Sequence, residues 1–354
     1  PVIMVRGKDD TVRLFFNVCR HRGSKVCYES YGSASRFRCM YHGWTYDTTG
    51  ELIGVPLRER YQDFEPENTL GLIPVPRVES YRGFVFASLN REGPSLAEHL
   101  GRGRHYLDLM CERAPDGEIE VTRPIKCDFF GNWKLSIENF SDNYHPSILH
   151  RSALEVGVNM LTQKYGDQKI TLGNASNYAE RTYGAGHGMQ DFGRTRGAMW
   201  MNAYANPGYL DALQAKHGAT RARELAEMDV HIIIYPNLLL ATRMNNFRVV
   251  KPVAVDRSEV WTYPCKLKGA PADVNEQIVL NASHHVSAMG EIQVDDLQCF
   301  TWIQEGLQAE AMEWILLKLH GKDERMNEFG EFEWQGASEE IIRHQYREWL
   351  RLMG

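Results

Sequence analysis

A short stretch near the middle of the chain carries three side chains that could hold a metal or move a proton: Asp142, His145 and His150. On a helix, the three-residue step from Asp142 to His145 turns about 300°, so these two side chains share a face. The five-residue step to His150 turns about 500°, which would direct that ring away from His145 on an ideal helix. Pro146 lacks an N–H and disfavours helical geometry at the preceding residue. We therefore expect two helical pieces that meet at a kink, with both imidazoles turned toward one point.

Two neutral imidazoles suit Fe(II), zinc or copper, and one added carboxylate would complete the facial triad of a non-haem iron site. Taken alone, so short a pattern more often belongs to a helix with two ordinary histidines and an N-terminal acid. A carboxylate is available later in the chain, in the pair Asp295-Asp296. Such a pair also serves as the N-terminal cap of a helix, so the pattern needs support from elsewhere.

A second constellation lies near the start of the chain. Cys19-Arg-His21 is followed, after 17 intervening residues, by Cys39-Met-Tyr-His42. Two Cys/His pairs on tight loops could clamp one inorganic centre. Cysteine and histidine both suit tetrahedral zinc, and the same residues suit a [2Fe–2S] cluster held by two thiolates and two imidazoles.

Composition narrows the class of protein. The chain has 354 residues, is 43% hydrophobic and 24% charged, and carries a net charge of -6, which disfavours nucleic acid as a partner. The apolar run 232–241 is too short to span a membrane, and no signal peptide opens the chain. Seven scattered cysteines, an odd number, fit a reducing compartment, and we expect a cytoplasmic protein. Because the chain begins within a strand pattern at Pro1, we also expect that N-terminal residues are missing.

The pattern of the elements predicts an α+β protein with two domains. Residues 1–95 are rich in strand and turn signals and predict a small all-β domain. Residues 96–354 predict a second domain with a curved antiparallel sheet packed on helices, an architecture of the helix-grip type. The expected strands are 119–130, 229–235, 238–244, 247–255 and 259–267; the expected helices are 96–111, 133–140, 209–227, 275–289, 308–319 and 338–352.

The spacing Cys-x-His, 17 residues, Cys-x-x-His-Gly resembles the Rieske [2Fe–2S] signature. Neither loop has the extra cysteine of respiratory Rieske proteins, and the flanks Cys-x-His-Arg-Gly and Tyr-His-Gly-Trp-x-Tyr are similar to those of ring-hydroxylating oxygenases. With the later motifs in the same order, most of the chain resembles the α subunit of a Rieske non-haem iron aromatic-ring-hydroxylating dioxygenase of the naphthalene, biphenyl and benzoate type. The resemblance implies that Cys19, His21, Cys39 and His42 hold the cluster and that His145, His150 and Asp296 hold Fe(II), with Asp295 as the alternative to Asp296.

The resemblance also implies a function. The chain would be a terminal oxygenase that uses O2 to convert an aromatic ring to a cis-diol, with electrons from NAD(P)H through a reductase and in some systems a ferredoxin. Asp142 would link a cluster histidine of one subunit to an iron-ligand histidine of its neighbour, which implies a homotrimer of α subunits, joined by a β subunit as α3β3. Physically, a carboxylate that accepts hydrogen bonds from two imidazoles fixes their tautomers.

Rough alignment with the family places five residues at the substrate pocket: Asn139, Phe140, His231, Val286 and Ile292. Each is also an ordinary core position. Arg243 and Arg248 lie in a strand that could border the pocket, where an inward guanidinium would pair with a substrate carboxylate, although a solvent-facing arginine is the commoner case. We expect His187, His284 and His285 to be structural or solvated. Alternative functions are a Rieske monooxygenase or demethylase, and, outside enzymes, an electron-transfer or zinc-binding protein.

Overall fold

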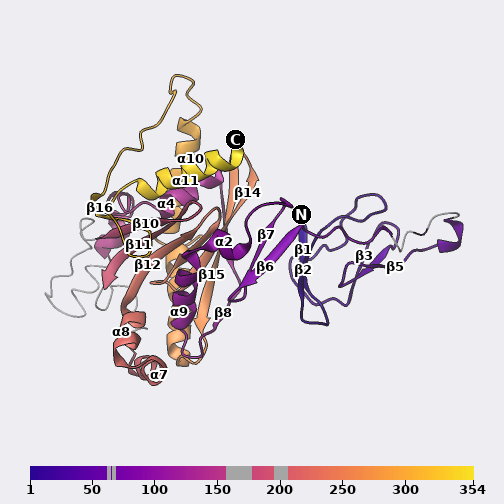
Figure 1. The fold of residues 1–354 in the computed structure, drawn as a ribbon. Coiled ribbons are helices and arrows are strands. Elements are labelled where there is room, and N and C mark those ends of the chain that lie inside the picture. Colours follow the sequence, from indigo (N-terminus) through magenta and orange to yellow (C-terminus); the bar gives the residue numbers. More distant parts are fainter. Residues whose placement is uncertain (62–64, 66–68, 157–177, 195–205) are drawn as a thin grey trace. The chain divides into compact units, whose positions relative to one another are not determined.

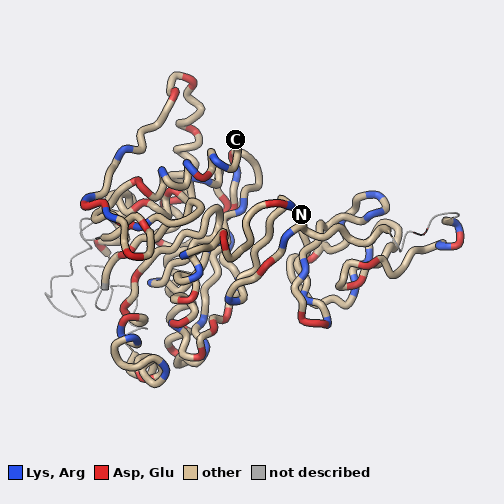
Figure 2. The backbone as a smooth tube through the Cα atoms, in the orientation of Figure 1, with Lys and Arg blue, Asp and Glu red and all other residues tan. Residues whose placement is uncertain are grey.

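The computed structural model describes residues 1–61, 65, 69–156, 178–194 and 206–354 (Figure 1). It divides into two compact units, Pro1–Glu98 and His99–Gly354. Acidic and basic residues are interspersed along both units (Figure 2). Within the described ranges, no helix combines the length and the apolar character that a membrane span requires.

The first unit is built from short antiparallel strands. β1 (Val2–Arg6) pairs with β2 (Val12–Phe16), β3 (Arg36–Arg38) with β4 (Thr45–Asp47), β4 with β5 (Leu52–Gly54), and β6 (Arg77–Tyr81) with β7 (Phe84–Ser88). A 3-10 turn spans Arg58–Arg60, and α2 spans Leu96–Leu100. The buried core contains Phe15, Phe37 and Tyr46, and also Cys19 and Cys39. The core thus fixes the bases of the two cysteine loops, and the expected all-β character of this region is confirmed.

The second unit contains one large antiparallel sheet. Its strands, among the described residues, follow the order β16-β17-β10-β11-β12-β13-β14-β15-β8, with β9 also paired to β15. Their bounds are β8 Ile119–Val121, β9 Ile125–Phe129, β10 Ala179–Tyr183, β11 His187–Arg194, β12 Met228–Ile234, β13 Leu238–Ala241, β14 Asn246–Ala254, β15 Arg257–Leu267, β16 Lys322–Met326 and β17 Phe332–Gln335. The predicted α+β class is confirmed, and the four central strands lie within a few residues of their expected positions.

The second unit also contains helices, several of which pack against the sheet. The helices are α3 Gly103–Glu112, α4 Trp133–Phe140, α5 Pro146–Leu149, α7 Pro207–His217, α8 Ala219–Glu227, α9 Ala272–Val286, α10 Gln293–Gly306 and α11 Glu340–Met353. α4 lies against β12, β14 and β15, α9 against β15, and α10 against β9 and α4. The core between α4 and the sheet includes Ile137, Phe140, Ile233, Leu239 and Val250. This packing places the ends of α4 and α10 together.

Three predicted elements are divided in the structure. The expected helix 209–227 is two helices that separate at Gly218, whose φ of 78° is a left-handed value that glycine adopts without strain. The expected helix 96–111 separates into α2 and α3, and the expected strand 119–130 into β8 and β9. In each case, the apolar pattern is right and a short break in regular structure falls inside it.

The predicted helix 308–319 is wrong. Helix α10 ends at Gly306, and the following residues run without regular structure as the extended segment that precedes β16 in Figure 1. Several apolar side chains of this segment are exposed, including Met312 at 46%, Trp314 at 72% and Leu316 at 63%. Helical stability in proteins comes mostly from packing of an apolar face. Within one chain, this stripe has no face to pack on, so its helical period is not realised.

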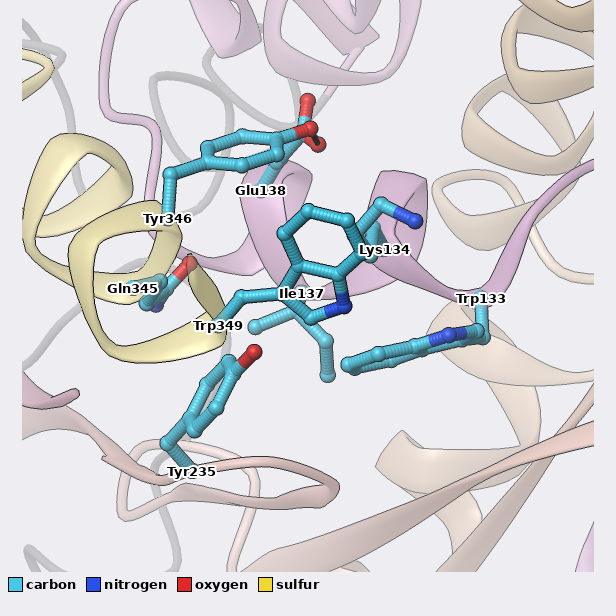
Figure 3. A pocket seen from close by; sticks show the side chains of 8 residues that line it. All are labelled: Trp133, Lys134, Ile137, Glu138, Tyr235, Gln345, Tyr346 and Trp349. Atoms are coloured by element: carbon cyan, nitrogen blue, oxygen red, sulfur yellow. Dashed lines mark hydrogen bonds between the residues drawn. The ribbon is translucent and has the colours of Figure 1, made fainter. Parts of the chain in front are cut away.

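The C-terminal helix α11 braces α4. The Gln345 amide donates to the Ser141 hydroxyl at 2.8 Å, and the Tyr346 hydroxyl donates to the Glu138 carboxylate. Figure 3 shows Glu138, Gln345 and Tyr346 around a small pocket that Trp349 and Tyr235 also line. Burial raises the pKa of Glu138, and the hydrogen bond from Tyr346 acts in the opposite direction. The brace fixes the C-terminal end of α4, from which the residues of the central motif follow.

Candidate metal centres

The two cysteine loops of the first unit have the same backbone turn. Gly23 N–H donates to the Cys19 carbonyl and Gly43 N–H to the Cys39 carbonyl, both at 2.9 Å, and both glycines have a positive φ, 76° and 75°. Each cysteine N–H donates to the carbonyl five residues later. Because these φ values favour glycine, the glycine that follows each Cys/His pair is a requirement of the turn.

The two loops bring the four expected ligands together. The rings of His21 and His42 lie 4.5 Å apart between centroids, and His21 stacks on Trp44 at 4.9 Å with an interplanar angle of 6°. Cys19 and Cys39 are 3% and 2% exposed, and the Cys19 sulfur lies 3.4 Å from the Tyr46 hydroxyl. The sulfurs are therefore buried, and both imidazoles lie nearer the surface.

The donor set fits an iron–sulfur cluster. Nδ1 of His21 is buried without a hydrogen-bond partner among the described residues, as expected of an atom reserved for a metal. Burial lowers the pKa of His21, which keeps the ring in the neutral form that binds metals. Burial opposes ionisation of Cys39, yet N–H groups of Tyr41 and His42 hold the pKa of its thiol below the ordinary value. Two thiolates and two neutral imidazoles are the Rieske ligand set.

The central motif differs from the expected kinked helix. α4 ends at Phe140, the next five residues form turns, and α5 begins at Pro146. Asp142 therefore lies in a turn and not on a helix, and His145, the N-cap of α5, has helical angles (φ −64°, ψ −33°) although a proline follows. The convergence of the two imidazoles is confirmed, but the turn between α4 and α5 produces it.

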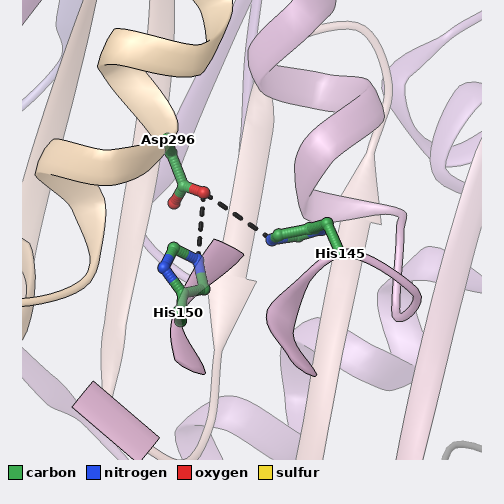
Figure 4. Close-up of side chains that lie close together, drawn as sticks. All are labelled: His145, His150 and Asp296. Carbon is green, nitrogen blue, oxygen red and sulfur yellow. Dashed lines mark ion pairs between the residues drawn. The ribbon is translucent and has the colours of Figure 1, made fainter. Parts of the chain in front are cut away.

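His145, His150 and Asp296 form a compact triad (Figure 4). Asp296 Oδ1 lies 3.6 Å from His145 Nε2 and 3.1 Å from His150 Nε2. One potential ligand atom from each of the three residues lies within 4.8 Å of the other two. His150 and Asp296 are buried, with 4% and 8% of their side chains exposed. Asp296 reaches the histidines from the first turn of α10.

A second carboxylate lies within hydrogen-bond distance of the other ring nitrogen, Nδ1, of each histidine. His145 Nδ1 lies 3.1 Å from Asp142 Oδ2, and His150 Nδ1 lies 3.4 Å from Asp295 Oδ2. Both rings thus present Nε2 toward Asp296 and Nδ1 toward another acid. Metal-binding histidines commonly donate their other N–H to a carboxylate, which fixes the tautomer. Asp295, the alternative ligand, lies on the outer side of His150.

The carboxylates around the triad form a cluster of negative charge that a bound cation would balance. Asp142, Asp295 and Asp296 surround two imidazoles, and a partly buried carboxylate cluster of this kind is costly unless it is balanced. The Asn139 amide donates to Asp296 Oδ1 at 3.0 Å and lies 3.2 Å from His145 Nε2. Two imidazoles and one carboxylate on one side suit Fe(II) and leave other positions open.

Three of the five predicted pocket residues lie beside the triad. Asn139 contacts it directly, and the Phe140 ring stacks on His231 at 4.3 Å with an interplanar angle of 17°. Burial lowers the pKa of His231 well below its ordinary value, so this ring is neutral. Val286 ends α9, and Ile292 is the N-cap of α10. The lining role of these two residues stays a prediction.

The two candidate arginines differ in their surroundings. Arg243 precedes β14, in a turn rather than in the expected strand, and its guanidinium pairs with Asp229. Of the two arginines named as possible partners of a substrate carboxylate, Arg243 is therefore already paired within the chain. Arg248 lies in β14 with its guanidinium 5.2 Å from the Phe140 ring centroid. Arg248 thus faces the site.

The remaining predicted histidines have structural contacts. His187 is buried, and its Nε2 lies 2.8 Å from the His99 carbonyl while its Nδ1 accepts from Tyr235 N–H. Burial lowers the pKa of His187 to about 3, which keeps it neutral. His284 and His285 both approach Glu291 Oε1, at 3.3 and 3.2 Å, and tie the loop after α9. The structural interpretation of these histidines is consistent with those contacts.

Sequence reasoning missed several residues near the site. Glu180 is fully buried on β10 and bonds the Ser338 backbone N–H and the Asn143 amide. Burial, with a smaller contribution from the charge of Asp142, raises its pKa to about 7. Gln293 precedes Asp296 by one helical turn and is 3% exposed. A polar residue one turn before a candidate ligand was the available signal for Gln293, whereas Glu180 had none.

Two family models match the chain, one within each of its two compact units. The Rieske [2Fe-2S] domain model matches residues 1–76, and the model of the ring hydroxylating alpha subunit (catalytic domain) matches residues 116–354. The two matches define a Rieske non-haem iron oxygenase. The chain belongs to the family of ring-hydroxylating α subunits, and its cofactors are a [2Fe–2S] cluster and a mononuclear iron.

The related proteins include enzymes named for neutral aromatic compounds and enzymes named for aromatic acids. The chain is 30% identical to biphenyl dioxygenase subunit alpha of Paraburkholderia xenovorans, over 100% of this chain and 80% of that one. It is 32% identical to the 2-halobenzoate 1,2-dioxygenase large subunit of Burkholderia cepacia, over 89% and 68%. The structure of naphthalene 1,2-dioxygenase with indole in its active site superposes with a TM-score of 0.85 at 26% identity, covering 98% of this chain and 80% of that one. The predicted family, enzyme class and iron cofactors are confirmed, and the chain is one component of a multi-component system.

Proposed function

We propose that this chain adds both atoms of O2 to one face of an aromatic ring to give a cis-diol. Electrons would come from NAD(P)H through a reductase, with a ferredoxin between them in some systems. The observation that carries the proposal is the convergence of His145 Nε2 and His150 Nε2 on Asp296 Oδ1, beside the stacked rings of Phe140 and His231.

We assign the ligands as follows: Cys19, His21, Cys39 and His42 for the cluster, and His145, His150 and Asp296 for the iron. When bound, Fe(II) supplies open coordination positions for O2 beside the substrate, and the cluster supplies electrons one at a time. On this assignment, residues 1–95 form the electron-transfer domain and residues 96–354 the catalytic domain.

The chain's own groups orient the site. Asp142 and Asp295 accept from the Nδ1–H groups of the two histidines and hold their Nε2 atoms toward Asp296. The Asn139 amide holds Oδ1 of Asp296 by a hydrogen bond. Phe140 and His231 present a neutral, stacked surface on which an aromatic ring can lie. Burial of this surface keeps water away from the reacting ring.

Asp142 has a second role in the proposal. Its side chain is 25% exposed, so the carboxylate that holds His145 can also accept a hydrogen bond from outside the subunit. A cluster histidine of a neighbouring subunit is the proposed donor, which joins the two metal centres through one carboxylate. Each cluster then serves the next subunit, and three α subunits close a ring.

Exposed apolar side chains favour the proposal that this chain has partner subunits. Trp302, Met312, Trp314 and Leu316 lie on α10 and the segment after it and are between 46% and 72% exposed. Exposed apolar patches of this kind commonly mark protein–protein contacts. We assign this segment to contacts within an α3β3 assembly. None of the seven cysteines, all of which lie in the described parts of the chain, forms a disulfide, in keeping with the reducing cytoplasm that we propose as its location.

Product analysis with 18O2 tests the proposal. The chain, expressed with its partner subunit and supplied with NADH and a reductase, should form a cis-diol that carries two 18O atoms. Incorporation of one atom would replace the dioxygenase assignment by the monooxygenase alternative. A colourless protein that contains zinc and no acid-labile sulfide would leave the electron-transfer and oxygenase assignments without their cofactor.

A further inference from the structure

One face of the large sheet carries a row of polar side chains. In antiparallel strands, residues directly opposite each other point to the same face. Gln190 on β11 lies opposite His231 on β12, and Ala241 on β13 lies opposite Asn246 on β14. His231 and Ala241 are themselves opposite each other, so these four residues share one face.

The next row continues the same face. Ile233, Leu239 and Arg248 are opposite one another across β12, β13 and β14, and Thr262 on β15 is opposite Arg248. Ile233 and Leu239 belong to the core that packs on Phe140 of α4. The polar side chains of both rows therefore face α4 and the triad, and not solvent.

These polar groups are buried and have no partners within the described parts of the chain. Gln190, Asn246 and Thr262 are 0% exposed. Both amide atoms of Gln190 and of Asn246, the Thr262 hydroxyl and Arg248 Nε all lack a hydrogen-bond partner there. Both amide atoms of Gln293, which lies one turn from Asp296 on α10, also lack a hydrogen-bond partner among the described residues. Buried polar atoms in folded proteins are nearly always satisfied, so a set of this size indicates a place for a polar ligand.

Arg248 gives this face a positive charge. No hydrogen bond or ion pair joins its guanidinium to another side chain in the described chain, whereas Arg243 is paired with Asp229. Burial lowers the pKa of Arg248, and the negative charge of Asp296 acts in the opposite direction. Arg248 is thus a partly buried cation within electrostatic reach of the triad, with its guanidinium carbon 5.2 Å from the centroid of the Phe140 ring.

We infer that the aromatic substrate carries a carboxylate, which Arg248 binds with help from the Thr262 hydroxyl while the ring lies against Phe140. The inference rests on the proposed function, since it names the substrate class of the same site. A guanidinium binds a carboxylate through two parallel N–H···O bonds. A neutral hydrocarbon would leave the cation and the amides unsatisfied, which a binding site strongly disfavours.

Benzoate and nitrobenzene offer a matched pair of probes, because they have nearly the same shape and differ in charge. Binding of each is measured by calorimetry on the protein with both iron centres loaded, without NADH. The wild type should bind benzoate more tightly than nitrobenzene. Arg248→Gln should weaken benzoate binding about 100-fold, the effect expected for a buried hydrogen bond to a charged group, and leave nitrobenzene binding within a few-fold.

Two further variants complete the experiment, one as a control and one as a second test of carboxylate binding. Arg257→Gln removes a half-exposed arginine of the neighbouring strand and should leave both affinities unchanged. Thr262→Val keeps the shape of the side chain and should weaken benzoate binding several-fold, which gives a second reading if Arg248→Gln unfolds. Equal benzoate affinity in wild type and Arg248→Gln, or tighter binding of nitrobenzene by the wild type, would overturn the inference.

A purely electrostatic role of Arg248 toward the iron site would give a different result. If Arg248 only balances the charge of Asp296, Arg248→Gln changes iron affinity and leaves the ratio of benzoate to nitrobenzene binding as it is in the wild type, which overturns the inference. If benzoate binds through Arg248 and no cis-diol forms, the proposed function fails and this inference stands. If neutral arenes give cis-diols and benzoate does not bind, the proposed function stands and this inference fails.

Discussion

The role of Asp142 can be isolated because the site contains a near-duplicate of it. Asp142 and Asp295 each accept a hydrogen bond from Nδ1 of one histidine of the triad, at 3.1 and 3.4 Å. Only Asp142 is proposed to bond a cluster histidine of the next subunit as well. Asp142→Asn and Asp295→Asn should therefore weaken iron binding alike, and they should differ in their effect on electron transfer.

The shared effect is on iron affinity. Asparagine keeps an acceptor oxygen, so each ring keeps its orientation, while the charge that strengthens the hydrogen bond is lost. Charge-assisted hydrogen bonds are about twice as strong as neutral ones, and the loss corresponds to roughly tenfold weaker iron binding. Competition with a chelator should show this decrease in both variants.

The separate effect is on electron transfer. With iron at saturation and the cluster reduced, O2 and substrate are added in a stopped-flow experiment, and cluster oxidation is followed by its visible absorption. Asp142→Asn should be slower than wild type by about 100-fold, the upper end for outer partners of metal ligands. Asp295→Asn should stay within a few-fold of wild type. Equal rates in the two variants would refute the bridging role of Asp142.

Three further variants test the electrostatics and packing around the sites. Since burial raises the pKa of Glu180 from 4.5 to about 7, the folded chain binds an extra proton between these values, and the free energy of unfolding should fall by about 3 kcal/mol as the pH rises through this window. Glu180→Gln should remove this decline in urea titrations at several pH values. Tyr46→Phe removes the hydroxyl beside the Cys19 sulfur and should lower the reduction potential of the cluster in a redox titration. Leu239→Ala empties a fully buried position under α4 and should lower the free energy of unfolding by about 2–5 kcal/mol.

Exposed residues of the same types serve as controls. Glu305→Gln should keep the pH dependence of the wild type, Tyr41→Phe should keep its reduction potential, and Leu280→Ala should cost less than about 1 kcal/mol. A Glu180→Gln variant with the wild-type slope would show that this carboxyl ionises normally. An unchanged potential in Tyr46→Phe would show that its hydroxyl does not bond the cluster thiolate.

The metal motifs were accessible from sequence because their geometry is local. A Cys/His pair followed by a glycine determines one tight turn, and two such pairs with similar flanks require the same turn twice. His145 and His150 are five residues apart, so they converge by whichever local bend connects them. The bend itself was not predicted correctly, since a turn after Phe140 replaces the expected helix.

The polar face of the sheet was not accessible from sequence. Whether Arg248 points to the triad or to solvent depends on strand register, which one sequence does not define. Arg243 lies five residues earlier, in a turn, and its guanidinium pairs instead with Asp229 of β12. The prediction of a helix at 308–319 was wrong for a related reason, because the apolar side chains of this segment have no surface to pack on within one chain.

The most direct test of the account is anomalous diffraction at the iron edge from crystals of the iron-loaded protein. The account predicts one iron among His145 Nε2, His150 Nε2 and Asp296, and a separate pair of irons held by Cys19, Cys39, His21 and His42. A map with no iron at the triad, or with zinc in place of the pair, would contradict it.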